Sequence, residues 1–331
     1  MAKPKKDPVK LYNEEVKHDF LQLYSKGSED YYKRIFEKSV VLENRLDRDL
    51  FDFTLEELED LMFDLDPMTI NAAQTNYSII SSYISFAIDK GYRTNSINSL
   101  KAMGSTWSEK FVDKSKKLYF SSYEIDEIIL NLDNAQDAVI VSLLFHGVCG
   151  KEFSEIRNLT KHDLDLENNI LTLRNEKGLK RKLHVKNENL FTLLRQAFAQ
   201  TKYVKRNRQM DELSNSTPEI DLVANDFIVR KTAIVGRDND PVEKNVIFRR
   251  INLTKELFDI PYFTTKNIFR SGVIAEAKEV YLREGKLEKD QLTRIANKFQ
   301  IANTHLMKEY CNIDNIMALY GDEIRESEEG Q

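Results

Sequence analysis

The chain has 331 residues and a formal net charge of −5 at pH 7, with 49 basic and 54 acidic side chains. This balance excludes a uniformly basic nucleic-acid-binding protein, although local basic patches can still bind DNA. Only 11 Gly and 6 Pro occur, which favours long helices over a loop-rich β protein. The length predicts two domains.

The two cysteines, Cys149 and Cys311, are far apart in the sequence and form no paired metal or redox motif. The basic start of the chain is not followed by an apolar run, and no apolar run has the length of a membrane span. We therefore expect no metal, no cofactor and no membrane, and a location in the reducing cytoplasm.

Residues 1–112 are predicted to form an N-terminal helical domain. Apolar residues recur at helical spacing in 13–27, 28–46 and 68–91. Between the second and third of these segments, Thr54 is followed three residues later by Glu57, a capping-box pattern that predicts a helix start. Short connections between these helices predict a small bundle.

The long helix of this bundle exposes one polar face, formed by Asn71, Gln74, Thr75 and Ser78. Asn and Gln side chains are the usual partners of adenine in the major groove of DNA. The face is therefore a candidate for contacts with bases. An ordinary solvated helix face is equally compatible with the sequence.

Residues 113–120, at the end of a lysine-rich stretch, are predicted to be a linker, and residues 121–331 a second domain. This domain is expected to be mainly α-helical with one small β-hairpin. A helix capped by Ser121 or Ser122 comes first. The later elements are predicted as a buried helix at 135–147, a β-hairpin within 168–185, a helix at 188–209 with a basic end, a strand at 226–232, and helices at 245–258, 264–285, 288–300 and 301–311.

Four stretches of the second domain carry a family resemblance. They are "GKEFSEIRNL" from Gly150, the hairpin turn with Lys177, "NIFRSG" with Arg270, and "FQIANTHLMKEYC" with Tyr310. With the order of elements given above, they resemble the tyrosine recombinases, or phage integrases, over nearly the whole chain. The resemblance implies an N-terminal core-binding bundle and a C-terminal catalytic-type domain that clamp a DNA duplex.

The resemblance also implies where the catalytic residues should stand. The family pattern T-G-L-R-x-S-E-L places its first phosphate-binding arginine on Glu152, and a shift of one residue offers Lys151 instead. The two supporting histidine or tryptophan positions fall on Asn267 and Ile301. A carboxylate reverses the charge that should hold the scissile phosphate, and an asparagine moves no proton near neutral pH.

Lys177, Arg270 and Tyr310 remain from the family's set as vestigial positions. Residues that act as one catalytic unit fail together. We therefore predict that the protein is not an enzyme and that it still binds DNA although the catalytic activity has been lost. The predicted DNA-contacting residues of the second domain are Lys177, Lys180, Arg181, Lys182, Arg206, Arg249, Lys266, Arg270 and Tyr310, with Lys202, Lys205, Arg208 and Arg250 as further basic groups.

The chain further resembles an integrase-like repressor that maintains the lysogeny of a prophage. This implies a sequence-specific transcriptional repressor that binds double-stranded operator DNA near the nucleoid of a bacterial host. Two alternatives stay open: an active recombinase with a rearranged site, and a non-specific DNA-binding accessory protein. Self-association or a phage regulatory protein is also open as a partner. The acidic tail after Tyr320 is expected to remain in solvent.

Overall fold

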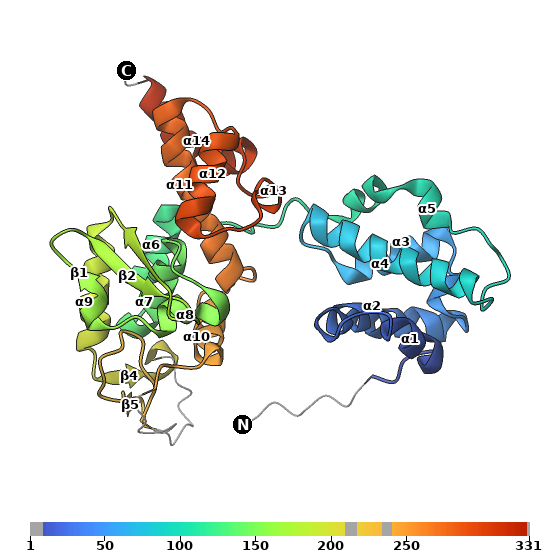
Figure 1. The fold of residues 1–331 in the computed structure, drawn as a ribbon, viewed down its shortest axis with the longest axis horizontal. Helices are drawn as coiled ribbons and strands as arrows, with labels where there is room; N and C mark the ends of the chain where they lie inside the picture. The colour runs from blue at the N-terminus through green and yellow to red at the C-terminus, as the bar shows by residue number, and fades with distance from the viewer. Residues whose placement is uncertain (1–8, 209–216, 234–239, 330–331) are drawn as a thin grey trace. The chain divides into compact units, whose positions relative to one another are not determined.

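A computed structural model of the protein describes residues 9–208, 217–233 and 240–329 (Figure 1). The basic start of the chain and residues 209–216, 234–239 and 330–331 lie outside the described residues. The chain divides into two compact units, Met1–Lys116 and Lys117–Gln331. The boundary lies inside the segment 113–120 that the sequence marks as a linker.

The first unit is a bundle of helices. Its helices are α1 (Glu14–Leu21), α2 (Lys26–Leu46), α3 (Leu55–Leu65), α4 (Ile70–Asp89) and α5 (Ser99–Met103), with 3₁₀ turns at Leu50–Asp52 and Ser105–Phe111. The predicted break at Gly27 is wrong, because α2 begins after Ser25 and includes Gly27. Gly27 lies in the first turn of α2, where the backbone N–H groups have no acceptor within the helix. Glycine therefore costs less helix stability there than in the helix interior.

The start of α3 confirms the predicted capping box. The Glu57 N–H donates to Thr54 Oγ1 at 3.3 Å, and the Thr54 N–H donates to Glu57 Oε2 at 2.8 Å. This exchange satisfies two backbone donors that the helix itself cannot pair. It fixes the entry of α3 into a core in which Phe36, Leu58 and Tyr83 are fully buried.

A buried ion-pair cluster crosses the core of this bundle. Lys17 Nζ lies 2.7 Å from Glu43 Oε1 and 3.0 Å from Asp49 Oδ2, and none of the three side chains is more than 1% exposed. The Tyr83 hydroxyl donates to Asp49 Oδ1 at 3.0 Å. Helix propensity and apolar spacing do not reveal this cluster, because its members come from separate elements.

The second unit contains the helices α6 (Ser122–Leu130), α7 (Ala135–Phe145), α8 (Ser154–Arg157), α9 (Glu188–Ala199), α10 (Lys244–Leu257), α11 (Thr265–Glu284), α12 (Lys289–Phe299), α13 (Thr304–Met307) and α14 (Ile313–Glu329). Its strands are β1 (Leu164–Asp165), β2 (Ile170–Arg174), β3 (Lys180–His184), β4 (Lys202–Val204) and β5 (Glu219–Asp221). The strands form an antiparallel sheet in the order β1-β2-β3 and an antiparallel pair β4-β5. The mainly α fold with a small hairpin sheet is confirmed.

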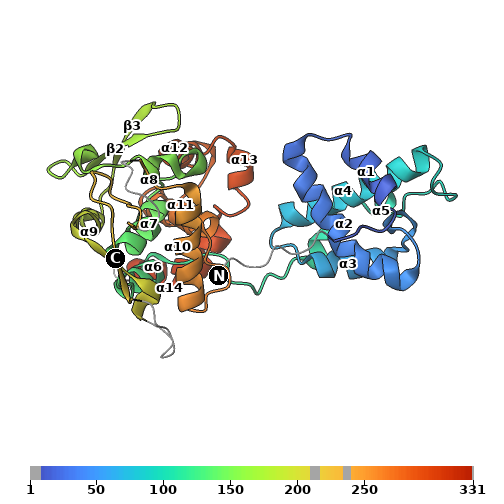
Figure 2. The same ribbon diagram turned by 90° about the horizontal axis from the view of Figure 1, so that it is seen from below.

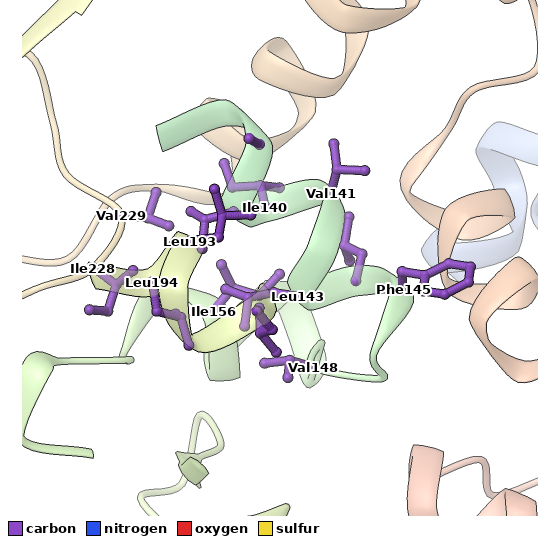
Figure 3. Packing of buried hydrophobic residues seen from close by; sticks show 14 of the residues in the cluster. Ile140, Val141, Leu143, Phe145, Val148, Ile156, Leu193, Leu194, Ile228 and Val229 are labelled. Carbon is purple, nitrogen blue, oxygen red and sulfur yellow. The ribbon is translucent and has the colours of Figure 1, made fainter. Parts of the chain in front are cut away.

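Helix α7 is the centre of the second unit, as Figures 1, 2 and 3 show. It is buried from Gln136 to Phe145 and packs against α6, α9, α10 and α11. The approach of α11 is very close, because a Cβ on Gly272 would lie 1.7 Å from the Phe145 carbonyl oxygen. Burial on all sides explains why the sequence of α7 is apolar without a polar face.

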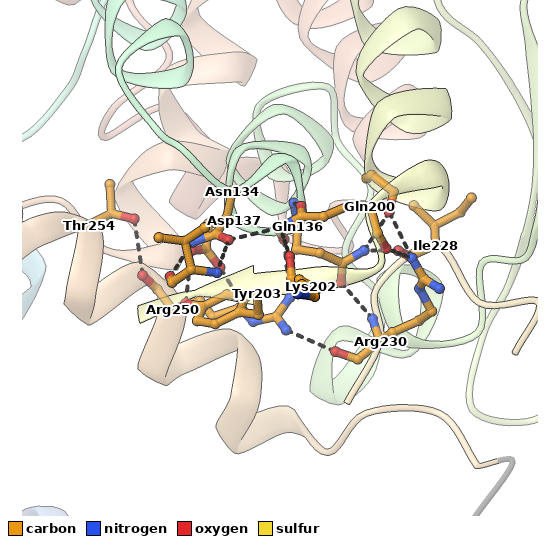
Figure 4. Close-up of polar contacts among 12 residues, drawn as sticks. Asn134, Gln136, Asp137, Gln200, Lys202, Tyr203, Ile228, Arg230, Arg250 and Thr254 are labelled. Atoms are coloured by element: carbon orange, nitrogen blue, oxygen red, sulfur yellow. Dashed lines mark hydrogen bonds and ion pairs between the residues drawn. The ribbon is translucent and has the colours of Figure 1, made fainter. Parts of the chain in front are cut away.

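The predicted helix 188–209 is wrong in its second half, because α9 ends at Ala199 and the chain continues into β4. The Arg230 guanidinium donates to the carbonyls of Ala197 and Phe198 in the last turn of α9. It also donates to the carbonyl of Gln200, the residue that caps this helix (Figure 4). A cation at a helix C-terminus stabilises that end. The predicted strand at 226–232 forms only isolated bridges, at Phe227 and Thr232.

The predicted helix 301–311 is reduced to α13. The acidic tail after Tyr320 continues α14, with Asp322, Glu323 and Glu326 exposed as expected and Ile324 buried. Ile316, Tyr320 and Ile324 are at most 4% exposed and pack in the cluster formed with α11. The Ser122 N–H donates to the Tyr320 hydroxyl oxygen at 3.0 Å. The acidic residues of the tail do not prevent burial because apolar residues recur every four positions.

Candidate nucleic-acid interface

The loop after α7 contains the first candidate position, Glu152. Gly150 has φ +69°, and a Cβ there would lie 2.5 Å from a neighbouring side-chain oxygen, so glycine is required. Glu152 and Phe153 also have left-handed backbone conformations, with φ +54° and +60°. The 3₁₀ turn Lys151–Phe153 follows Gly150, and the short helix α8 follows that turn.

Glu152 forms an ion pair with Lys244, the first residue of α10. Lys244 Nζ lies 2.5 Å from Glu152 Oε1, and both side chains are close to half exposed. The hydrogen bond from Lys244 lowers the pKa of Glu152, so this carboxyl is ionised at neutral pH. The pair is neutral in total and provides no guanidinium at the position of the family's first arginine. Lys151 lies next to it and is exposed.

Arg181 is half-buried, and its guanidinium is held by partners within the unit, so a DNA contact by Arg181 stays a prediction. Its Nε lies 2.6 Å from Glu155 Oε1, and its Nη2 lies 2.8 Å from Oε2. The same guanidinium donates to the backbone carbonyls of Gly147 at 2.9 Å and Lys298 at 3.0 Å. Arg181 therefore ties β3 to α8, to the end of α7 and to α12.

The exposed side of the hairpin is basic. Side chains alternate along β3, so Lys180 and Lys182 are exposed while Arg181 and Leu183 point inward. Lys177 lies at the exposed turn, where Asn175 Oδ1 accepts hydrogen bonds from the N–H groups of Lys177 and Leu179, each at 2.9 Å. The exposed hairpin lysines have no ion pair among the described residues. They form a strip of positive charge suited to phosphate.

Arg270 and Tyr310 are brought together by α11 and the segment before α14. The guanidinium carbon of Arg270 lies 4.5 Å from the centroid of the Tyr310 ring, a cation–π contact. Tyr310 is only 5% exposed, and burial raises the pKa of its hydroxyl to about 12, with Arg270 opposing the shift. The phenol is therefore fully protonated at neutral pH.

Neither supporting position supplies a proton acceptor to Tyr310. The side chain of Asn267 donates from Nδ2 to the Tyr262 carbonyl at 2.9 Å. Ile301 packs, partly buried, against the cluster of α11, α12 and α14. Lys266 lies near Arg270, where burial and the neighbouring guanidinium lower its pKa. The site keeps positive charge, and neither Asn267 nor Ile301 supplies the proton-accepting imidazole of the family pattern.

Arg249 and Arg206 lie on neighbouring elements, α10 and the turn Lys205–Arg208, and both are exposed. Arg250, the next residue, is buried, and its guanidinium donates to the backbone carbonyls of Gln136 and Arg230 (Figure 4). Arg250 Nε also lies 3.4 Å from Asp137 Oδ1. The suggestion that Arg250 contacts DNA is therefore wrong, because it holds α10 to α7.

The four polar residues predicted on the long helix lie together on α4. Asn71, Gln74, Thr75 and Ser78 line a shallow depression of about 250 Å³, together with Tyr32, Ile79 and Ser82. The depression belongs to the first unit. The sequence pattern thus identified a shared face.

Two residues of the site were missed by sequence reasoning. Lys244 neutralises Glu152. The Arg270 guanidinium opposes the rise in the pKa of the Tyr119 hydroxyl that burial causes, and the Tyr119 ring centroid lies 6.3 Å from that of Tyr310. The reversed charge at Glu152 indicated that a compensating cation should exist. It did not indicate where in the chain this cation lies. Tyr119 gave no signal, because it lies in the linker segment.

Among the described residues, no group of three or more His, Cys, Asp or Glu side chains is placed to hold a metal ion. No helix in the described part of the chain is long and apolar enough to cross a membrane.

Two family models match the chain. One is described as MrpR, C-terminal catalytic domain, and matches residues 119–321; the other, MrpR, N-terminal core-binding domain, matches residues 11–89. The SPbeta prophage-derived uncharacterized protein YopR of Bacillus subtilis (strain 168) is 29% identical over 326 residues, which cover 95% of this chain and 98% of YopR.

Solved structures of lambda integrase share the fold. A lambda integrase dimer bound to a COC′ core site has a TM-score of 0.53 and 10% identity, covering 91% of this chain and 77% of the integrase chain. Lambda integrase residues 75–356 bound to DNA have a TM-score of 0.50 and 10% identity, covering 91% and 96%. The tyrosine-recombinase-like fold expected from the sequence is confirmed.

Proposed function

The chain belongs to the MrpR family, and from this premise we propose that it is a sequence-specific DNA-binding transcriptional repressor of a prophage, built on a tyrosine-recombinase fold that no longer cuts DNA. The name of the relative YopR places that protein in a prophage, which supports the same setting here. We propose the cytoplasm of the bacterial host as the place where the protein binds its operator.

The observation that carries the proposal is the ion pair of Glu152 with Lys244. Phosphoryl transfer needs preorganised cations around the phosphate and a group that accepts the nucleophile's proton. The first cation position holds a carboxylate, Tyr310 is buried and protonated, and the two supporting positions hold Asn267 and Ile301. The same surroundings suit a protein that binds the DNA backbone and leaves it intact.

The basic groups that remain support binding. Lys177, Lys180 and Lys182 project from one hairpin, and Arg206 and Arg249 project from neighbouring elements. Each contact with a phosphate releases a counterion, so a few such lysines and arginines give strong, salt-dependent affinity. Lambda integrase, which shares the fold, has been solved on DNA. This supports duplex DNA as the ligand of the same architecture here.

The test begins with recovery of bound fragments. The full chain is incubated with sheared DNA of the host and its prophage, and bound fragments are sequenced. Recovered sites are then titrated against shuffled duplexes of equal length at about 0.15 M salt, where a specific site should bind at least about 1,000-fold more tightly. A ratio near one would overturn the repressor and leave a non-specific DNA-binding protein.

A second arm tests for cutting. A recovered site carrying a nick next to the candidate cleavage position would trap a covalent adduct through Tyr310 in an active recombinase. We expect no adduct in overnight incubation, with an active tyrosine recombinase on its own site as the positive control. An adduct that disappears in Tyr310→Phe would overturn the proposal in favour of an active recombinase.

A further inference from the structure

A cavity of about 390 Å³, called the α11 cavity below, lies within the second unit. Its wall is formed by the end of α7, the segment that follows β3, one face of α11 and the end of α12. Phe145 and Phe299 contribute apolar surface to this wall. The volume is within the range of pockets that bind small organic molecules. Glu152, Arg270 and Tyr310 do not belong to its lining, so the cavity is separate from the family's catalytic positions.

His146 presents a hydrogen-bond acceptor to the α11 cavity. His146 Nδ1 lies 2.8 Å from the Ser142 carbonyl oxygen. A carbonyl only accepts, so Nδ1 carries the hydrogen of this bond. Burial lowers the pKa of His146, so the imidazole is neutral at neutral pH and its Nε2 keeps a lone pair. This Nε2 lies on the side of the ring opposite the bond to Ser142 and has no hydrogen-bond partner among the described residues. A ligand N–H can therefore donate to it.

Lys186 supplies a cation to the same cavity. It is exposed, lies in the segment that follows β3, and forms no ion pair with any residue that the structure describes. The two carboxylates of the lining are already neutralised, Glu276 by Lys298 at 2.5 Å and Glu279 by Lys278 at 2.9 Å. They therefore do not cancel the charge of Lys186, which is available to an anionic group.

We propose that the α11 cavity binds a small organic anion whose charged group contacts Lys186 and whose N–H donates to His146 Nε2. The apolar body of this ligand lies against Phe145 and Phe299. Two kinds of small molecule share this chemistry: nucleoside monophosphates with an exocyclic amino group, and N-acylated aromatic amino acids. A metal ion fits less well, because no three ligating side chains are placed together in the described part of the chain. The site does not depend on the proposed DNA-binding function.

The test uses isothermal titration calorimetry with the full chain and two series of ligands. In the first series, AMP is compared with adenosine, which lacks the anion, and with purine riboside 5′-monophosphate, which lacks the amino group. In the second series, N-acetylphenylalanine is compared with its amide, which lacks the anion, and with its N-methyl derivative, which lacks the N–H. We expect one of the two parent anions to bind. Loss of either group should weaken binding at least about fivefold, the effect of one hydrogen bond.

Two variants test whether the ligand lies in the α11 cavity. Lys186→Ala and His146→Phe should each weaken binding of the parent anion at least about fivefold. His146→Phe should also bind the parent and the analogue without the N–H equally well, because the acceptor is already absent. Lys289→Ala and His305→Phe, at exposed positions outside the cavity, are the matched controls and should bind as the wild type does. Thermal unfolding checks that all variants fold, and the exposed Lys186 can be replaced without disturbing the core.

Three results would overturn the inference. The first is that neither parent anion binds at concentrations up to about 5 mM. The second is that inorganic phosphate or acetate binds as tightly as the matching parent, because charge alone is then recognised. The third is unchanged binding in both Lys186→Ala and His146→Phe, which would place the ligand outside the α11 cavity. These measurements contain no DNA, so a failure here leaves the proposed repressor function untouched.

Discussion

Tyr310 and Glu152 illustrate how single residues set the chemistry of this fold. The hydroxyl of Tyr310 lies in a buried site beside the Arg270 guanidinium, and its pKa is raised to about 12. A phenol that stays protonated is a poor nucleophile without a base to accept its proton. Its ring, by contrast, holds the Arg270 guanidinium through the cation–π contact. The hydroxyl and the ring of Tyr310 therefore make separable contributions to DNA binding.

Removal of the hydroxyl should therefore change little. We expect Tyr310→Phe to bind its operator within about twofold of wild type, because the ring and its contact with Arg270 persist. Tyr310→Ala, which removes the ring, should weaken binding more. Fluorescence anisotropy on a recovered site measures both, and thermal unfolding checks that both variants fold. A tenfold loss in Tyr310→Phe with normal folding would mean that the hydroxyl contacts DNA.

Lys17 is the buried cation between two carboxylates in the core of the first unit. Its removal in Lys17→Met leaves the carboxylates of Glu43 and Asp49 buried without a cation, so we expect a loss of about 3–5 kcal/mol in the free energy of unfolding. Urea denaturation measures this loss. Lys38→Met, at an exposed position of the same helix bundle, is the control and should change stability by less than about 0.5 kcal/mol.

Glu43 gives that cluster a pH dependence. Burial raises the pKa of Glu43, while Lys17 opposes the shift. A raised carboxyl pKa favours the protonated form in the folded state, so this contribution to stability is present below the unfolded pKa and is lost as pH rises through the folded pKa.

The stability of Glu43→Gln relative to wild type should consequently increase as pH rises from about 4 to 7, because glutamine does not titrate. Urea unfolding at several pH values measures the difference. A difference that is flat or decreases over this range would contradict the raised pKa.

At the scale of elements, the hairpin of β2 and β3 separates two roles by the alternation of a strand. Lys180 and Lys182 are exposed, whereas Arg181 between them binds Glu155 and two backbone carbonyls. The composition identifies all of these residues as basic, but it does not show which of them are exposed and which point inward. The register Leu171↔Leu183 places the inner face on the core and thereby assigns each neighbour.

Replacing Lys177, Lys180 and Lys182 by alanine together should weaken DNA binding without loss of stability. The slope of log affinity against log salt should become shallower by up to about 2.7, the value for three phosphate contacts. Salt titrations by anisotropy measure the slope. Lys286→Ala with Lys289→Ala, at an exposed position after α11 and at the exposed first residue of α12, is the control for non-specific loss of positive charge, and it removes two charges where the hairpin variant removes three.

Arg181→Met should behave in the opposite way. It leaves Glu155 buried without its partner, so the unfolding free energy should fall by about 3–5 kcal/mol. If Arg181→Met is fully stable and only the salt slope changes, Arg181 contacts DNA and its internal hydrogen bonds are not important for stability.

At the scale of the whole molecule, two units with separate cores are joined by one covalent connection. The cores of the first unit and of the second unit share no members, and the boundary lies between Lys116 and Lys117. Helix α14 completes the second unit from within the same chain. Each unit therefore contains what it needs to fold.

Separate expression of residues 9–116 and 117–331 should give two cooperatively folded proteins. Joined in one chain, the units should bind a recovered site at least about 100-fold more tightly than either unit alone, because the first contact raises the effective concentration of the second. An equimolar mixture of the two fragments should not restore that affinity. Equal affinity of one fragment and the full chain would show that a single unit carries recognition.

The sequence by itself determined the mainly helical fold, the capping box at Thr54, the hairpin and the positions of Glu152, Arg270 and Tyr310. These follow from local spacing and from motif residues that keep their order along the chain. Only the tertiary structure decided that Lys244 neutralises Glu152 and that Arg181 pairs with Glu155. It also showed that the tail continues α14 and that Ile324 of this tail is buried. These features arise from contacts between distant segments and from the direction of single hydrogen bonds, and neither leaves a periodic signal in the sequence.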